Sequence, residues 1–491
     1  MSIKSNYIKY FLFFLLSISF LIYNDTTAKT SKKNLKKPSS VTKSISKKNT
    51  SKKSTVKKSS NKKNKVCKKS KRSKSEKSNA PSLTIIKDSL LEEGINYKNV
   101  FLKAGKSNHS VHILEVDISE NNNAVEVLKA NNYVNDLKQL SEIIQDNNEH
   151  SNYFGGINGS FWRAYSNKPI GPTIVNGEVV ELKRYKSWSS VFFDSLGKPY
   201  FDNFDLECKI KLKKQEIVVD RFNQRRDSNS VVIYNRFAGN QIPFISQSHI
   251  DKAVNSFLEL YNDNTVFNDS TESDYDLETY IAENLELERV NSIEFPLKKV
   301  SCIYLEKPQI NKEIKCVIKQ IDTGVVAIPE NGFIISFGIN HYLNTEKIKI
   351  NDTIIYKVSS NVLQNNYFTD GLSATPRLVR NGKAENEARK EGSRGRRFIN
   401  RALPRSAIGA NKSSNKIFLV SVEGNNRTKK TVGASLSQLS NIMSKIGCYN
   451  AMNLDGGGST TMVINGLNII NNYNPNKSRR ISVGLAVKKL K

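Results

Sequence analysis

The stretch from which the fold can be worked out reads Asn453-Leu454-Asp455-Gly456-Gly457-Gly458-Ser459-Thr460-Thr461-Met462-Val463. The residues before it have the composition of a buried strand, which ends at Asp455. Three consecutive glycines indicate backbone packed against something that a Cβ would block. Ser459 and Thr460 then supply hydroxyl and N–H groups. A carboxylate, a bare turn and hydroxyl groups at a strand end suit a phosphate or a sugar. The alternative is a tight hairpin turn capped by Asp455.

A second carboxylate is expected at the same sheet edge. Residues 417–423 form an apolar strand that ends in Glu423, and residues 436–446 carry apolar side chains on one helical face. A strand–helix–strand crossover places both strands parallel in one sheet, so Glu423 and Asp455 emerge together. The patterns predict an α+β (mixed α/β) fold, with a central mixed sheet, flanking helices and a partly helical inserted lobe.

Two carboxylates and an arginine suit the hydrolysis of a glycosyl phosphate. One acid protonates the leaving oxygen while the other activates water, and Arg405 holds the phosphate through two hydrogen bonds. A buried ion pair between Arg405 and either carboxylate fits the same spacing. Asn158 follows another strand and either binds the ligand or caps a turn. The predicted catalytic residues are Asp455, Glu423 and Arg405. The predicted substrate-binding residues are Asn158, Gly159, Gly456, Gly457, Gly458, Ser459 and Thr460.

Several of these motifs together resemble the phosphodiester glycosidase family, which includes the uncovering enzyme and exported bacterial proteins of exopolysaccharide biosynthesis. The motifs are NLDGGGSTTM at 453–462, PRSAIG at 404–409, INGSF at 157–161 and IPENGFIISFG at 328–338. Leu403 stands where the family usually has His, and Glu423-Gly424 where it usually has Asp-Gly. The resemblance covers roughly residues 110–490 outside the segment 245–295. It implies a glycosidase-type hydrolase that acts on sugar phosphodiesters.

The N-terminus has the pattern of a secretory signal over residues 1–28. Lys4 and Lys9 flank an apolar run from Tyr10 to Tyr23, and small residues follow at 26–28. The run is shorter than the roughly 20 residues that a membrane-spanning helix needs. An uncleaved N-terminal anchor is the alternative. Either interpretation predicts an exported protein that is secreted, periplasmic or bound to the cell envelope.

Residues 29–80 predict a disordered basic segment. They contain 20 Lys and one Arg against one Glu, out of a net charge of +30 for the whole chain. Such a segment repels itself and cannot bury a core. Behind an export signal, its counter-charge is expected to be an anionic envelope polymer or a membrane surface. A solvated spacer is the alternative, and the export signal argues against nucleic acid as a partner.

The remaining residues, 81–491, are predicted to form one phosphodiester glycosidase-like domain with an acidic insertion at 245–295. The five cysteines contain no Cys-x-x-Cys pair, and a Cys302–Cys316 disulfide is left open. The five histidines show no ligand spacing, so we expect neither a metal nor another cofactor. The function that we predict is hydrolysis of a sugar-1-phosphodiester in an envelope or extracellular glycan. A non-catalytic protein that binds envelope polysaccharide in the same cleft is the alternative.

Overall fold

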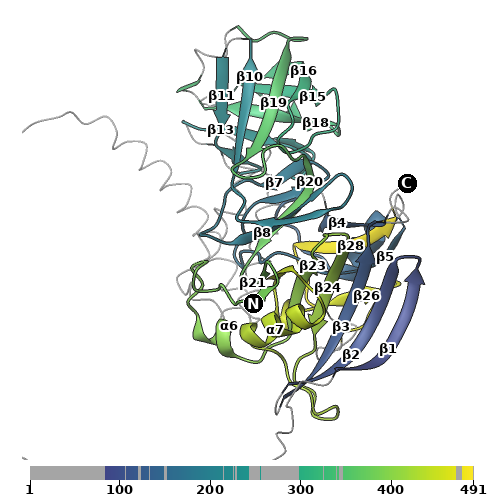
Figure 1. Ribbon diagram of the computed structural model, residues 1–491. Coiled ribbons are helices and arrows are strands. Elements are labelled where there is room, and N and C mark those ends of the chain that lie inside the picture. The colour runs from purple at the N-terminus through teal and green to yellow at the C-terminus, as the bar shows by residue number, and fades with distance from the viewer. Residues whose placement is uncertain are drawn as a thin grey trace, which may run out of the picture. The chain divides into compact units, whose positions relative to one another are not determined.

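The computed structural model describes residues 83–242 and 298–489, together with Asn255. Short gaps lie at 105–106, 120–122, 132, 149–151, 214, 225, 227–228, 325, 339, 342–346 and 471–477. The signal segment, the basic segment and nearly all of the acidic insertion lie outside the described residues. Figure 1 shows that the described chain is built mainly from strands.

The first eight-stranded sheet carries the strand that leads to Asp455. In spatial order its strands are β1 (Leu83–Glu92), β2 (Ile95–Ala104), β3 (Ser107–Asp117), β24 (Lys416–Val422), β23 (Arg405–Ala410), β25 (Asn450–Asn453), β21 (Arg377–Arg380) and β22 (Lys383–Ala384). Residues from both ends of the described chain therefore form one sheet, because β3 pairs with β24.

The predicted crossover is present in this sheet. β24 and β25 are both antiparallel to β23, so they run parallel to each other with β23 between them. The helix α7 (Leu436–Lys445) connects them. Ser435 caps this helix by accepting from the Gln438 N–H, and the buried face of α7 is apolar, as the 3.6-residue period predicted. The crossover brings the ends of β24 and β25 to one edge of the sheet.

Two five-stranded sheets lie in contact with the first one. One has the order β7 (Glu178–Glu181), β6 (Thr173–Val175), β20 (Phe368–Ala374), β8 (Ser189–Asp194) and β9 (Pro199–Asp202). The other has the order β27 (Leu467–Asn468), β26 (Met462–Ile464), β5 (Tyr153–Asn158), β28 (Val483–Lys489) and β4 (Asn123–Lys129). The glycine-rich turn thus passes from the first sheet into the β5-containing sheet, where β26 pairs with β5.

A second eight-stranded sheet has its own apolar core. Its order is β11 (Gln215–Val219), β10 (Leu206–Leu212), β19 (Thr353–Ser360), β16 (Ile314–Asp322), β15 (Lys299–Tyr304), β18 (Gly332–Phe337), β13 (Val231–Tyr234) and β12 (Arg221–Phe222). A two-stranded sheet pairs β14 (Gln241–Ile242) with β17 (Val326–Ala327). Cys302 and Cys316 lie on neighbouring strands here, but both thiols are free and buried, so no disulfide joins them.

The prediction of an α+β fold with flanking helices is wrong. Besides α7, the described residues form only the α-helices α2 (Leu140–Asn147) and α6 (Arg396–Asn400). The largest core cluster combines Leu114, Leu419, Val127 and Val191, which come from three different sheets. Sheets with one apolar face can cover each other, and here they take the place that we expected helices to fill. The fold is mainly β.

Candidate active site

The glycine-rich turn holds Asp455 between two sheets. After β25 ends, the chain makes one turn of 3-10 helix before β26 begins. A Cβ on Gly456 would lie 3.1 Å from the carbonyl oxygen of Pro404. A Cβ on Gly458 would lie 3.1 Å from the guanidinium carbon of Arg479. A side chain at Gly456 would crowd the backbone of Pro404, whereas the exposed Arg479 side chain can move away from one at Gly458, so the turn is crowded chiefly at Gly456.

The side chain of Asn158, at the end of β5, forms hydrogen bonds with Asp455, Ser406 and Thr461. Its Nδ2 donates to the carbonyl oxygen of Asp455 at 2.7 Å. Its Oδ1 accepts from the Ser406 hydroxyl at 2.6 Å and from the Thr461 N–H at 3.1 Å. The Asp455 N–H in turn donates to the carbonyl oxygen of Gly159 at 3.0 Å. Asn158 and Gly159 therefore lie beside Asp455, where their bonds to the protein position the turn.

The carboxyl group of Asp455 is half-buried, and burial raises its pKa to about 6. The Ser459 side chain, the Gly456 N–H at 2.8 Å and the charges of Arg479 and Arg405 act in the opposite direction. Burial disfavours the ionised form, while donors and positive charges favour it. Asp455 consequently changes charge close to neutral pH, which suits a group that exchanges a proton during a reaction.

The side chain of Arg405 is buried where β23 begins. Its Nε donates to the carbonyl oxygen of Ala434 at 2.9 Å, and its Nη2 donates to those of Phe398 at 2.6 Å and Arg401 at 3.3 Å. Burial lowers the pKa of this guanidinium to about 10, and the charge of Asp455 acts in the opposite direction. The guanidinium therefore stays cationic at neutral pH. Among the described residues, Nη1 has no hydrogen-bond partner. Arg405 therefore brings a fixed positive charge to Asp455, and the two-point phosphate clamp stays a prediction.

Glu423 belongs to a different cluster of polar side chains. Its Oε1 lies 2.8 Å from Nε2 of His112 and 3.1 Å from Nζ of Lys429. Nδ1 of His112 lies 2.8 Å from the Tyr97 hydroxyl. Burial acts to raise the pKa of Glu423, but the hydrogen bonds and charges of His112 and Lys429 outweigh it and hold the pKa below its usual value. Glu423 is therefore an ionised partner of a buried histidine.

The strand pairing explains why Glu423 and Asp455 are separated. Arg405 lies opposite Val422, and Val422 faces the core beneath α7. Successive residues of a strand point to opposite faces, so Glu423 points away from that core, toward His112. Asp455 lies close to the Arg405 side chain instead. The structure thus brings Asp455, Arg405 and Asn158 together and leaves Glu423 on the other face of the same sheet edge.

The hydroxyl residues of the turn are directed to the protein. Ser459 and Thr460 are buried, and the Ser459 side chain bonds to Asp455. The Thr460 N–H donates to the carbonyl oxygen of Gly457 at 3.3 Å, and Gly457 has the positive φ of 61° that favours glycine. Their predicted contact with substrate is not seen in these bonds and stays a prediction.

Replacing Glu423 by Gln is expected to lower stability more than turnover. The variant removes the charge that His112 and Lys429 share, at a cost of roughly 2–3 kcal/mol of unfolding free energy near pH 7. Because the pKa of Glu423 is lowered in the folded state, this contribution is present above the unfolded pKa and fades as pH falls through the folded value. Denaturation followed between pH 3 and pH 7 measures it. A loss of turnover as large as that from changing Asp455 would instead place Glu423 in the reaction.

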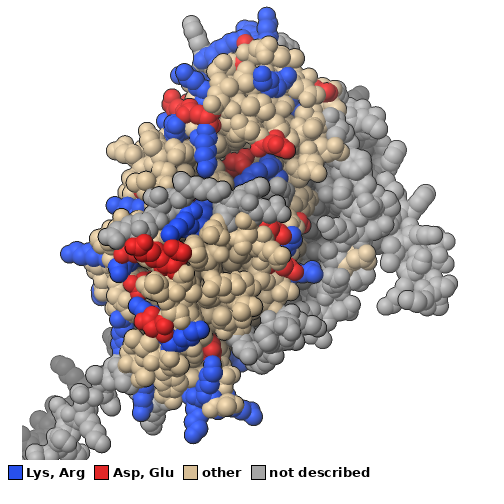
Figure 2. All heavy atoms as spheres, turned by 90° about the vertical axis from the view of Figure 1, so that its right-hand side faces the viewer, with Lys and Arg blue, Asp and Glu red and all other residues tan. Residues whose placement is uncertain are grey.

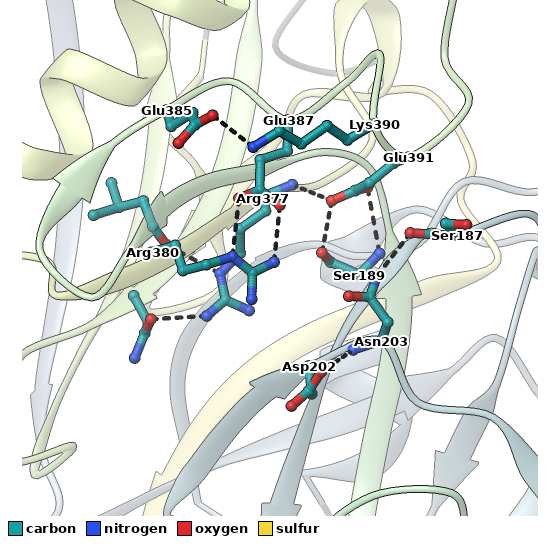
Figure 3. A network of polar contacts seen from close by, with 12 residues as sticks. Ser187, Ser189, Asp202, Asn203, Arg377, Arg380, Glu385, Glu387, Lys390 and Glu391 are labelled. Carbon is teal, nitrogen blue, oxygen red and sulfur yellow. Dashed lines mark hydrogen bonds and ion pairs between the residues drawn. The ribbon is translucent and has the colours of Figure 1, made fainter.

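A polar network, shown in Figure 3, supports the strand that leads to Asp455. Glu391 accepts from the Ser189 hydroxyl at 2.7 Å and from the Arg377 N–H at 2.7 Å. Arg377 Nη2 donates to Oδ1 of Asn450, in β25, at 2.7 Å. Burial raises the pKa of Glu391 against these hydrogen bonds. The network joins β8, β21 and β25, so it fixes the position of the turn that follows β25.

Sequence reasoning missed Arg479 and gave His112 no role in a site. Arg479 is exposed, and its charge acts on Asp455. The sequence feature that could have indicated Arg479 is the pair Arg479-Arg480. This pair comes just before β28, and β28 pairs with β5 as far as Asn158. His112 lies in β3, but its partner Glu423 is 311 residues away in the sequence. Nothing local in the sequence indicates that contact.

Most of the candidate site residues lie in a range that matches a known protein family. Residues 315–488 match the family model of phosphodiester glycosidases. The predicted resemblance to this family is confirmed over that range. The matched range includes Arg405, Glu423, Asp455 and Arg479, whereas Asn158 precedes it. The candidate site around Asp455 therefore lies mostly within the phosphodiester glycosidase match.

One curated relative agrees with the family match, and two solved structures are similar in fold. The chain is 34% identical over 109 residues to the Bos taurus N-acetylglucosamine-1-phosphodiester alpha-N-acetylglucosaminidase, covering 21% of this chain and 20% of that one. A hypothetical protein from Synechocystis has 18% identity and a TM-score of 0.55, with 83% of this chain and 64% of that chain covered. A predicted exported protein from Burkholderia pseudomallei K96243 has 13% identity and a TM-score of 0.53, with 83% and 96% covered. The two solved structures are similar in fold, and the curated relative is matched over a fifth of its length.

Proposed function

We propose that the chain is an exported hydrolase that cleaves sugar-1-phosphodiester linkages in an envelope or extracellular glycan. The observation that carries this proposal is the half-buried carboxyl group of Asp455, with a pKa of about 6, beside the positive charges of Arg479 and Arg405. A carboxylate that titrates near neutral pH can take a proton from water, and two guanidinium groups can stabilise a phosphate. The family match supplies the substrate class.

The proposed mechanism depends on the leaving group, which is a weakly basic phosphate monoester. A phosphate monoester leaves far more readily than an alcohol, so it needs charge stabilisation more than protonation. In the proposed step, a water oxygen bonds to the anomeric carbon, the bond between that carbon and the phosphate oxygen breaks, and Asp455 takes the proton of the water. Arg479 and Arg405 stabilise the departing phosphate. Glu423 has no part in this step because it lies on the other face of the sheet edge.

Export is supported by the N-terminal sequence and by the name of one relative. Residues 1–28 have the pattern of a secretory signal, and a structural neighbour is a predicted exported protein. In the part of the chain that the structure describes, no helix has the length and hydropathy that a membrane span requires. The signal pattern of residues 1–28 is the reason for placing the proposed hydrolysis outside the cytoplasm.

The direct test of the activity is hydrolysis of methyl N-acetylglucosamine 1-phosphate in water enriched in oxygen-18. We expect release of N-acetylglucosamine and methyl phosphate, with the heavy oxygen in the sugar, because water attacks carbon. Label in the phosphate would show attack at phosphorus and overturn the step. No turnover of this or other sugar-1-phosphodiesters, combined with binding of the glycan, would favour a non-catalytic polysaccharide-binding protein.

The basic segment 29–80 is proposed to tether the enzyme to an anionic envelope polymer or membrane surface. Figure 2 shows one face of the molecule, where basic and acidic side chains are interspersed rather than separated. Removing residues 29–80 should weaken binding to an anionic wall polymer, and the difference should shrink as salt is raised. Turnover of methyl N-acetylglucosamine 1-phosphate should stay the same. Equal loss of binding and turnover would show that the segment belongs to the folded enzyme.

A further inference from the structure

An aromatic cluster adjoins the candidate site. Phe161, just after the Asn158-Gly159 turn, has its ring 5.4 Å from that of Trp188 and 6.0 Å from that of Phe398. The ring of Tyr185 lies 4.8 Å from that of Trp188. We call these four residues the aromatic wall. The guanidinium carbon of Arg405 lies 5.4 Å from the ring centre of Phe398, so the wall begins next to the charge that faces Asp455.

The aromatic wall offers ring surface to a ligand. Phe161, Tyr185 and Phe398 are half-buried, so part of each remains accessible. Trp188 is 8% exposed, and its indole Nε1 has no hydrogen-bond partner among the described residues. This nitrogen is buried, so the surface available to a ligand is that of the three half-buried rings. A sugar ring fits such a surface, because its C–H face packs on aromatic rings.

Exposed arginines continue from the aromatic wall along the chain. Arg394, Arg396 and Arg401 flank Phe398 on the segment whose carbonyl oxygens hold Arg405. None of the three forms an ion pair with another described residue. Exposed cations elsewhere do, as in Lys213 with Asp352 at 3.1 Å and Lys429 with Glu423 at 3.1 Å. Positive charges without carboxylate partners leave this segment open to an anionic ligand.

We infer that the site takes a chain in which sugar phosphodiesters repeat, and this inference rests on the proposed function. The scissile phosphodiester lies at Asp455, Arg479 and Arg405. The next sugar packs on the aromatic wall, and the next phosphate binds Arg394, Arg396 and Arg401. The substrate class is therefore a poly(glycosyl phosphate), rather than a glycan with one isolated phosphodiester.

The test compares two ligands on the full chain carrying Asp455→Asn, so that binding is measured without turnover. One ligand is methyl N-acetylglucosamine 1-phosphate, and the other has two such repeats joined through the 6-hydroxyl. Calorimetry should show that the two-repeat ligand binds about tenfold more tightly or better. Changing Arg394, Arg396 and Arg401 together to Gln should remove most of that gain. Tyr185→Ala should remove part of it.

The matched control changes Lys211, Lys315 and Lys319 to Gln, which removes the same charge from exposed positions of the second eight-stranded sheet. This control should keep the gain. Equal affinity for the two ligands, or an equal loss in the control and the arginine variant, would overturn the inference. The proposed function fails separately, if wild-type protein binds the two-repeat ligand with the predicted gain and cleaves neither ligand.

Discussion

Asp455→Asn is expected to lower kcat on a sugar-1-phosphodiester about a hundredfold or more, the size of effect typical of general acid–base catalysis. Asparagine keeps the shape of the side chain, and its Oδ1 can still accept from the Gly456 N–H. What it removes is the group that takes a proton from water. In the wild type, kcat/KM should rise with pH through about 6 as Asp455 ionises. A rate that falls through the same range would make Asp455 the acid instead.

The same substitution should stabilise the fold near neutral pH. The pKa of Asp455 is about 6 in the folded chain, above the usual value of 3.8 for this side chain. The folded state therefore binds more protons between these values, and the free energy of unfolding falls as pH rises through this window. The asparagine variant has no charge to bury, so its Tm should exceed that of the wild type at pH 7.5, with a smaller difference toward pH 4. Full activity in a more stable variant would show that the carboxyl group serves no catalytic purpose.

Asn158→Ala is expected to have the largest effect on stability. It leaves three buried groups without their partner, namely the Asp455 carbonyl, the Ser406 hydroxyl and the Thr461 N–H. At typical values for unsatisfied buried groups, the loss is roughly 3–5 kcal/mol of unfolding free energy. Activity should fall as well, at least about tenfold, because an error in the position of Asp455 weakens catalysis.

Denaturant unfolding of Asn158→Ala and Ser406→Ala separates this effect from ordinary core damage. Ser406→Ala removes one of the three bonds, so about 1 kcal/mol is expected for it. Equal losses in the two variants would show that the bond from Asn158 to Asp455 contributes little. Measuring kcat alongside stability shows whether the position of the turn, and not only folding, depends on Asn158.

The sequence predicted the crossover and the turn because both are local patterns. The apolar face of 436–446 and the three glycines each depend on residues within a few positions. The fold class was mispredicted because the alternation of apolar and polar residues shows that a strand has one buried face, but does not show which element covers that face. Here other strands cover it, through contacts such as Leu114 with the sheets of β5 and β8 that are distant in sequence. A strand covered by helices and a strand covered by another sheet show the same alternation, so the prediction of flanking helices was wrong.

The candidate site was predictable to the same extent. Asp455, Arg405 and Asn158 were chosen because each lies at a strand end inside a motif; the structure brings them together, and their roles stay predictions. The roles of their polar atoms were not predictable, since the partners of Arg405 are backbone carbonyl oxygens. Glu423 was paired with Asp455 because both strands end at one edge, but the face of the sheet that each side chain takes depends on register. Arg479 follows no periodic pattern.

The pairing of β3 with β24 has a consequence for how the protein reaches its native state. Residues 107–117 complete their sheet only when residues 416–422 are available, and Asn158 bonds to a carbonyl 297 positions later. Contacts of such long sequence separation slow folding, because chain entropy is lost before they form. The entropic cost of closing a loop grows only with the logarithm of its length, so a longer segment between β14 and β15 would lower the free energy of unfolding only slightly. The sheet of β3 and the turn at Asp455 can therefore be completed only after residues 416–455 have left the ribosome.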